Sequence, residues 1–254
     1  LKRACERVGR VSVIAPDRNR SAIARGITIH SPLHVDEVRL EDGSPAFATD
    51  GTPVDCVRFA MLGLLGDVPD IVVSGINLGP NLGDDITYSG TVAAALEGVL
   101  LGWPAIAVSA DAVSDPGTRW EGRRYDFAAV AEFAASLVPL AAGGGFPPDV
   151  LLNVNAPGRP AHDPPRARVT RLGRRIYNDR LELHATEGTR RRYTIYGTDA
   201  GFHPEPGTDF AALEDGEISV TPLHFRLTDE GSLDVLAGLL ATGLAAPPTP
   251  GGTG

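Results

Sequence analysis

Short apolar runs alternate with helical patterns along much of the chain. Four runs are almost wholly apolar, as is typical of strands that are covered on both faces: residues 11–16, 69–75, 104–110 and 148–157. Three stretches between or after them have helical character: residues 53–65, 91–101 and 126–140, the last with Asp126 as a candidate N-cap. This alternation predicts an α/β fold with a doubly wound, mostly parallel sheet.

Two segments depart from this pattern and alternate apolar with polar positions instead. Residues 27–49 predict short strands with a turn at Asp42 and Gly43, and residues 167–196 predict an appended β-hairpin with turns near Gly173 and Gly188. The second hairpin is rich in arginine, which fits either a charged edge strand or a partner interface. The alternation in residues 217–225 predicts a strand that pairs with another.

The carboxyl-terminal part predicts a closing helix over residues 233–243 and a disordered tail over 244–254, so residues 1–243 form a single predicted domain. The first residue is Leu1 and the only methionine is Met61. We therefore expect that the chain is incomplete at its amino terminus.

Composition narrows the class of protein. The chain has 254 residues, 43% of them hydrophobic and 22% charged, and a formal net charge of -9, which argues against binding of a nucleic acid polymer. No apolar run reaches the roughly 18 residues of a membrane span, so no membrane partner is predicted. Two cysteines are too few for a disulfide framework, which favours the cytoplasm. A small phosphorylated ligand stays compatible with this charge because loop amides supply local positive potential.

The loop after the strand at 69–75 is the main candidate site. Four glycines lie from the end of this strand to the start of the next helix (Gly75, Gly79, Gly83 and Gly90), at the carboxyl end of a strand, where open α/β sheets bind ligands. A helix that begins near Ser89, Gly90 and Thr91 would direct amide N–H groups and two hydroxyls to the same place, as a phosphate site requires. Asn77 and Asn81 add neutral oxygens.

Simpler interpretations of this loop stay open. The asparagines and glycines would also serve merely to form turns. The loop is neither a P-loop, since it lacks Gly-Lys-Ser/Thr, nor a dinucleotide fingerprint, since its glycine spacing is different. Asp84 and Asp85 are adjacent, so their side chains point in opposite directions in extended backbone. We therefore interpret this pair as turn-forming rather than metal-binding.

Four further residues have modest predicted roles. Ser21 lies in a polar loop after the first strand and could reach the same edge of the sheet. Thr52 or Asp50 could cap the helix at 53–65. Cys56 is predicted to be a buried helix residue and not a nucleophile, since no electropositive neighbour is evident. The histidines have no metal-ligand spacing.

Four segments of the chain resemble, in order, the survival protein E (SurE) family of metal-dependent 5'/3'-nucleotidases. They are "APDRNRSAIARGITIH", "TDGTPVDCV", "VSGINLGPNLGDDITYSGTVAAALEG" and "EDGEISVTPLHFRLT". The resemblance implies a Rossmann-like core with an exchanged C-terminal element that joins subunits into a homodimer or homotetramer. It implies that the protein removes phosphate from nucleoside 5'- and 3'-monophosphates with one divalent cation, Mg²⁺ or Mn²⁺.

The resemblance also assigns roles to residues. Ser21 and Asn77 correspond to metal ligands of the family. The predicted phosphate- or substrate-binding residues are Asn81, Ser89, Gly90 and Thr91. The family's other metal ligands, an aspartate pair in an Asn-Asp-Asp-Gly sequence after its first strand, have no counterpart in this chain, so its catalytic residues are unassigned and we expect impaired activity.

Two other functions compete with this interpretation. The first is a non-catalytic module that binds nucleotide or phosphate, in which the aspartate pair is truly lost. The second is a nicotinamide-dependent oxidoreductase, which is disfavoured because Tyr88 has no lysine four residues later.

Overall fold

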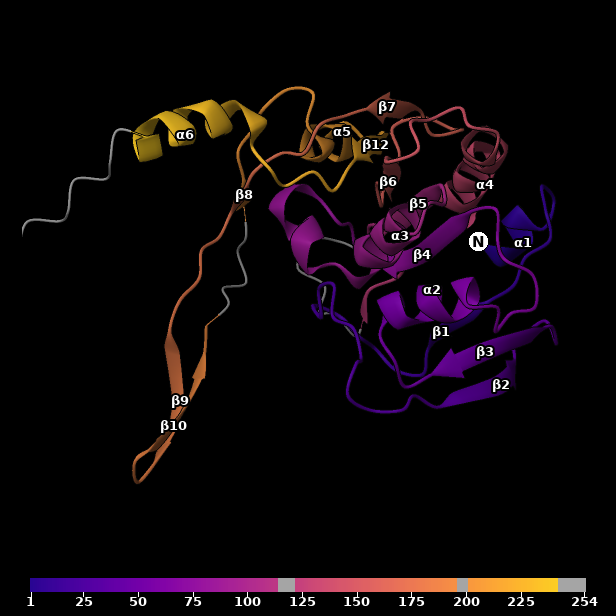
Figure 1. The fold of residues 1–254 in the computed structure, drawn as a ribbon, viewed down its shortest axis with the longest axis horizontal. Coiled ribbons are helices and arrows are strands. Elements are labelled where there is room, and N and C mark those ends of the chain that lie inside the picture. Colours follow the sequence, from indigo (N-terminus) through magenta and orange to yellow (C-terminus); the bar gives the residue numbers. More distant parts are fainter. Residues whose placement is uncertain (114–121, 196–200, 242–254) are drawn as a thin grey trace, which may run out of the picture. The chain divides into compact units, whose positions relative to one another are not determined.

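The computed structural model describes residues 1–113, 122–195 and 201–241, and it divides into two compact units, Leu1–His224 and Phe225–Gly254 (Figure 1). The helices of the first unit are α1 (Lys2–Cys5), α2 (Pro53–Met61), α3 (Gly90–Leu100), α4 (Ala128–Ala142) and α5 (Asp209–Glu214), with a 3-10 helix, η1 (Gly83–Tyr88). Its strands are β1 (Ile14–Pro16), β2 (Val35–Arg39), β3 (Pro45–Thr49), β4 (Val72–Leu78), β5 (Ala105–Ala110), β6 (Leu151–Ala156), β7 (Ala167–Val169), β8 (Arg175–Ile176), β9 (Glu182–Glu187), β10 (Arg190–Thr194), β11 (Gly201–Phe202) and β12 (Ile218–Leu223).

The main sheet has five strands in the order β4-β5-β6-β12-β7. The first three are parallel, β12 runs antiparallel to β6, and β7 runs parallel to β12. This confirms the predicted mostly parallel α/β sheet. It also confirms that the alternating segment at 217–225 contains a strand that pairs with others.

A smaller sheet has the order β1-β3-β2. The predicted hairpin at 27–49 is present as β2 and β3, with Gly43 at a φ of +80° in the turn between them. The predicted first strand differs from expectation, because β1 pairs in parallel with β3 and not with a strand of the main sheet.

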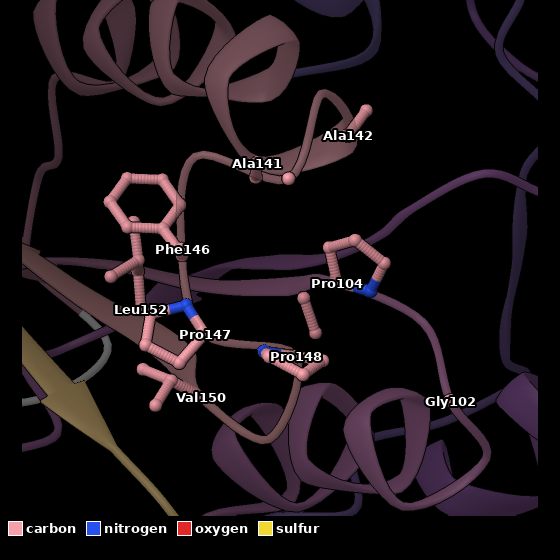
Figure 2. Close-up of a pocket in the computed structure, with 11 residues that line it drawn as sticks. Gly102, Pro104, Ala141, Ala142, Phe146, Pro147, Pro148, Val150 and Leu152 are labelled. Atoms are coloured by element: carbon pink, nitrogen blue, oxygen red, sulfur yellow. The ribbon is translucent and has the colours of Figure 1, made fainter.

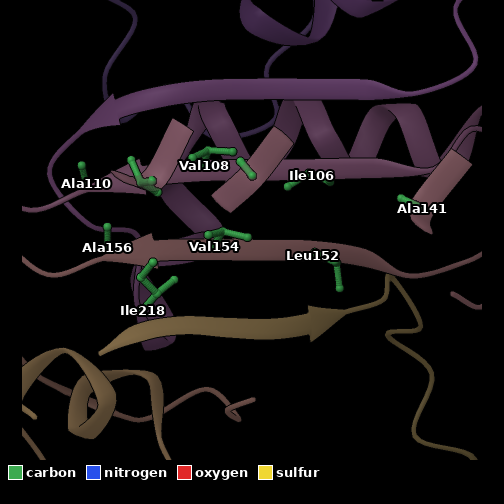
Figure 3. Packing of buried hydrophobic residues seen from close by; sticks show 10 residues of the cluster. Ile106, Val108, Ala110, Ala141, Leu152, Val154, Ala156 and Ile218 are labelled. Atoms are coloured by element: carbon green, nitrogen blue, oxygen red, sulfur yellow. The ribbon is translucent and has the colours of Figure 1, made fainter. Parts of the chain in front are cut away.

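Helices cover both faces of the main sheet. On one face, α4 packs on alternate side chains of β5 and β6, including Ile106, Val108 and Val154, which are wholly buried (Figure 3). On the other face, α3 packs through Val92, Ala95 and Val99. Removal of this apolar surface from water is the main stabilising contribution to the fold.

The helix starts follow local hydrogen bonding. Thr52 caps α2 in a reciprocal capping box with Asp55, which confirms one of the two predicted caps. The predicted N-cap Asp126 is wrong: the N-cap position of α4 is Phe127, with no side-chain cap. Asp126 instead accepts a hydrogen bond from the N–H of Ala128, the first residue of α4, at 3.0 Å, a short-range bond of the Asx-turn type.

The region predicted as one appended hairpin, 167–196, has three parts. β7 joins the main sheet, β8 pairs with β11, and β9 and β10 form a hairpin of their own around Gly188. The second unit contains η3 (Glu230–Ser232) and α6 (Leu233–Ala241), so the predicted closing helix is confirmed. The predicted tail, 244–254, lies outside the described residues. None of the described helices is long and apolar enough to cross a membrane.

Gly75 shapes the strand that leads into the candidate site. Its φ is +129°, and the pairing register of β4 with β5 shifts between Ser74 and Asn77. A Cβ atom on Gly75 would lie 2.3 Å from the carbonyl oxygen of Val108. Only glycine therefore permits this close approach of two backbones, and the approach determines where Asn77 lies.

This requirement can be tested with a matched pair of alanine substitutions. Gly102→Ala is the control, because Gly102 also has a positive φ, +94°, while its added Cβ would meet no described atom within 4 Å. We expect G102A to lower the free energy of unfolding by about 1 kcal/mol. We expect G75A to lower it by about 3 kcal/mol, because backbone atoms must move. Urea unfolding curves measure both, and equal losses would contradict the argument.

Candidate functional site

The start of α3 lies at the carboxyl edge of the main sheet and presents the groups predicted to bind phosphate. Ser89 is the N-cap, and its Oγ accepts a hydrogen bond from the Val92 N–H at 3.1 Å. The helix then begins at Gly90. The first amides of a helix have no acceptor within the helix, and they carry the positive end of its dipole. The cap and the phosphate interpretation of Ser89 are compatible, because its hydroxyl proton can still be donated.

Asn77 faces the same place. Its Oδ1 accepts a hydrogen bond from the Thr91 hydroxyl at 3.4 Å, while its Nδ2 donates to the Gly79 carbonyl at 2.8 Å. The end of β4 and the first turn of α3 thus bring together one predicted metal ligand and one predicted phosphate ligand.

The loop that carries Ser21 lies against the residues that precede α3. The Ala24 N–H donates to the Tyr88 carbonyl at 3.1 Å, and the Arg20 carbonyl oxygen lies 3.7 Å from the Cβ position of Gly90. The exposed Ser21 hydroxyl donates to Asn19 Oδ1 at 2.5 Å. The sequence prediction that this loop reaches the carboxyl edge is therefore consistent with the structure.

A buried acid on α3, Glu97, attaches this loop to the helix. Its side chain is 1% exposed, and Arg25 donates to its Oε2 at 2.9 Å. Arg58 of α2 lies 2.5 Å from its Oε1, an ion-pair contact that is not aligned as a hydrogen bond. Sequence analysis missed this residue, although a single charge among the apolar residues of 91–101 was the available signal.

Asn81 lies behind the loop in a buried network of amides and hydroxyls. Its Nδ2 donates to Ser109 Oγ at 2.7 Å, and its backbone N–H donates to Asn155 Oδ1 at 2.7 Å. Its carbonyl oxygen accepts from the side-chain amides of Asn153 and Asn155 at 2.9 and 3.1 Å. These bonds fix the loop to the carboxyl ends of β5 and β6.

Asp84 and Asp85 bind protein groups in this structure. Asp84 accepts the Arg175 N–H at 2.9 Å, and Asp85 accepts the Arg175 guanidinium at 2.8 and 2.5 Å and the Tyr177 hydroxyl at 2.9 Å. Burial, together with Asp85, raises the pKa of Tyr177 to about 12. The pair therefore attaches the segment at 175–177 to η1.

The residues present do not fit a hard divalent cation by themselves. Mg²⁺ and Mn²⁺ prefer carboxylate oxygens, while Ser21 and Asn77 offer one hydroxyl and one amide oxygen. Within the described ranges, no group of three or more His, Cys, Asp or Glu side chains could hold a metal ion.

Cys56 is also not part of a reactive site. It is buried in α2, as predicted, and burial raises its pKa to about 12. A thiol in this state is a poor nucleophile.

An apolar cavity of about 220 Å³ lies at the opposite edge of the sheet (Figure 2). Its lining includes Pro104, Phe146 and Pro148, at the amino ends of β5 and β6 and the end of α4. It is remote from the groups described above.

Comparisons with known proteins agree on one family. The sequence model described as "Survival protein SurE" matches residues 1–179. The chain is 51% identical to "5'-nucleotidase SurE" of Rubrobacter xylanophilus over 240 residues, which cover 92% of this chain and 89% of the relative. It is 46% identical to the protein of the same name from Herpetosiphon aurantiacus, covering 90% and 87%. The fold is similar to the crystal structure of the Sure protein from Aquifex aeolicus, with a TM-score of 0.74, 37% identity and coverage of 94% and 92%.

His34 and Asp50, which flank β2 and β3 of the smaller sheet, form an ion pair that leads to a testable prediction. The His34 ring lies 3.0 Å from Asp50, and this side-chain hydrogen bond and the carboxylate charge raise the pKa of His34. Asp50 also accepts the His34 backbone N–H at 2.9 Å. Because the folded-state pKa is the higher one, the stabilisation by His34 is complete below about pH 6.5 and disappears as the pH rises through the raised value.

We expect Asp50→Asn to lower the pKa of His34 toward that of a free histidine, as measured by NMR titration of its ring protons. The other histidines serve as internal controls, and their titration curves should not move. An unchanged His34 curve would show that Asp50 does not determine its charge.

Proposed function

The chain belongs to the SurE family, and from this premise we propose that its carboxyl edge binds the phosphate of nucleoside 5'- and 3'-monophosphates as the site of a 5'-nucleotidase. The names of the curated relatives support the nucleotidase class. The observation that carries the proposal is the hydrogen bond from the Thr91 hydroxyl to Asn77 Oδ1 at the start of α3. It places the Asn77 amide oxygen, a group that can bind a cation, next to the first backbone amides of the helix, which can bind phosphate.

In this proposal the chain's own residues bind and orient the phosphoryl group. The amides of Gly90 and Thr91 and the hydroxyls of Ser89 and Thr91 donate to its oxygens, and the helix dipole favours its negative charge. Because these donors are fixed by folding, they need little rearrangement as charge moves during hydrolysis. The Asn81 network holds the loop behind them rigid.

We also propose that residues 1–254 alone have weak phosphatase activity. The family resemblance requires one Mg²⁺ or Mn²⁺ ion, and the residues of this chain that correspond to the family's ligands, Ser21 and Asn77, are both neutral. Two neutral ligands do not meet the demand of a hard cation for carboxylates. A non-catalytic phosphate-binding module is the alternative outcome for this same chain.

The edge strand β4 of the main sheet suggests a direct test of the proposed impairment. β4 is the last strand in the order of its sheet, and it is half-buried and largely apolar, whereas exposed edge strands are normally short or charged. A strand supplied by an added segment would find a hydrogen-bonding edge there. We expect a chimera that adds the amino-terminal segment of the Rubrobacter xylanophilus relative, provided that it includes an Asn-Asp-Asp-Gly sequence, to restore the carboxylate ligands.

The assay compares AMP hydrolysis with Mn²⁺ by residues 1–254 and by the chimera. We expect at least about 100-fold faster turnover by the chimera, as is typical for the recovery of metal ligands. A chimera with Asn-Asn-Asn-Gly in place of the aspartate sequence is the matched control and should stay inactive. Rapid turnover by residues 1–254 would refute the proposed impairment, and inactivity of a folded, Mn²⁺-binding chimera would favour the binding module.

We further propose that the protein forms a homodimer or homotetramer. The helix α6 exposes apolar side chains such as Leu236 and Leu240, at 54% and 65%, and exposed apolar surfaces of this kind commonly mark interfaces. Exchange of C-terminal elements between subunits, as the family resemblance implies, would bury Leu236 and Leu240 against a second copy of the chain.

Light scattering after size-exclusion chromatography should therefore give two or four times the mass of one chain. The double variant Leu236→Glu and Leu240→Glu should lower that mass, because charges are costly in an apolar interface. A double variant at Asp229 and Glu230, both to serine, removes nearby charge and serves as the control. A wild-type monomer would refute the proposed assembly.

A further inference from the structure

Asp209 is a wholly buried carboxylate that is not among the predicted site residues. It is 0% exposed and occupies the first position of α5. Its Oδ2 accepts the Gly83 N–H at 2.7 Å, and its Oδ1 accepts the Gly173 N–H at 2.8 Å and the Phe210 N–H at 3.0 Å. One side chain thus joins three segments that are far apart in the sequence.

The neighbouring ring of Phe210 encloses the same contact. A Cβ atom on Gly83 or on Gly173 would lie 2.6 Å from this ring. Gly83 also has a positive φ, +51°. Both glycines therefore allow their backbones to come close enough for their N–H groups to reach Asp209.

The chemistry of this contact explains why the residue is an acid. Burial raises the pKa of Asp209, and the N–H groups of Gly83 and Gly173 act in the opposite direction. A buried carboxylate is costly unless it is fully hydrogen-bonded. A carboxylate can accept on both oxygens, whereas asparagine must present its own N–H groups on one side. The site therefore requires two acceptor atoms that face two backbone segments.

The hydrogen bonds of Asp209 hold η1, the short helix that precedes the proposed phosphate site. Gly83 begins η1, which ends at Tyr88, immediately before the Ser89 cap of α3. Asp84 independently accepts the N–H of Arg175, two residues after Gly173. The short helix η1 is thus attached at its first turn to the same segment, 173–175, that Asp209 holds.

We propose that Asp209 is a positioning residue of the phosphate site, which fixes η1 and thereby the donors of Ser89–Thr91. The part that concerns phosphate rests on the proposed function. Asp209 acts through Gly83 and does not touch the substrate.

The test compares Asp209→Asn with Asp215→Asn in the 254-residue chain. Asp215 is the matched control, because it follows the same helix but is exposed and bonded to Arg168. Calorimetric titration with inorganic phosphate measures affinity, and hydrogen exchange without phosphate measures the protection of the amides from Gly83 to Thr91.

For D209N we expect an affinity for phosphate that is about 10- to 100-fold weaker, because misplaced donors form weaker hydrogen bonds with a charged ligand. We expect exchange at Gly83 and through η1 to accelerate by about 10-fold, while exchange in β5 changes less. D215N should stay within about two-fold of wild type in both measurements, because exposed ion pairs contribute little.

A milder variant tests the same contact if D209N does not fold. Thr208 caps α5 through its hydroxyl, which accepts the Ala211 N–H at 3.3 Å. Thr208→Ala should loosen the start of α5 and shift both measurements in the same direction by a smaller factor.

The outcomes separate the two proposals. Unchanged exchange from Gly83 to Thr91 in D209N, or in T208A if D209N does not fold, would overturn the positioning role. So would acceleration of the same size in β5, which indicates a general loss of stability. If wild type fails to bind phosphate, the proposed site is wrong, while the exchange data still decide whether Asp209 positions η1.

Discussion

The backbone carbonyl of Asn81 accepts hydrogen bonds from two buried side-chain amides, and the arrangement of the carboxyl edge depends on this contact. On the α3 face of the sheet, alternate residues of β5 and β6 change from apolar to polar along the strands, ending at Ser109 and Asn155. Buried polar groups without partners are costly, so a loop that supplies partners for most of them is strongly favoured, although Asn153 Oδ1 has none. The loop that leads to α3 therefore has one well-defined position.

The parts of this fold that depend on neighbouring residues could be predicted from the sequence. The three parallel strands of the main sheet and their helices followed from apolar runs, and the capping of α2 by Thr52 followed from a local pattern. Bounds were less well predicted: the run at 69–75 becomes a strand that extends to Leu78, because Gly75 lets the strand continue past the close contact with Val108.

The parts that depend on distant partners could not be predicted. The sequence indicated that Ser21, Asn77 and Thr91 belong near one edge, since each follows a strand or begins a helix. It did not reveal Asp209, whose partners Gly83 and Gly173 are 126 and 36 residues away. It likewise did not reveal that Glu97 would be paired with arginines on two other segments. Only the three-dimensional contacts give such acids a role.

The apolar cavity and the proposed phosphate-binding donors of Ser89–Thr91 lie at opposite ends of the main sheet. Pro104 precedes β5 at one end, and Ser109 closes the polar network at the other. Larger apolar side chains could therefore fill the cavity with little effect on the loops at the far edge, since distant sites usually contribute additively to stability. For an engineer, this separation means that heat resistance and substrate range can be selected in independent libraries.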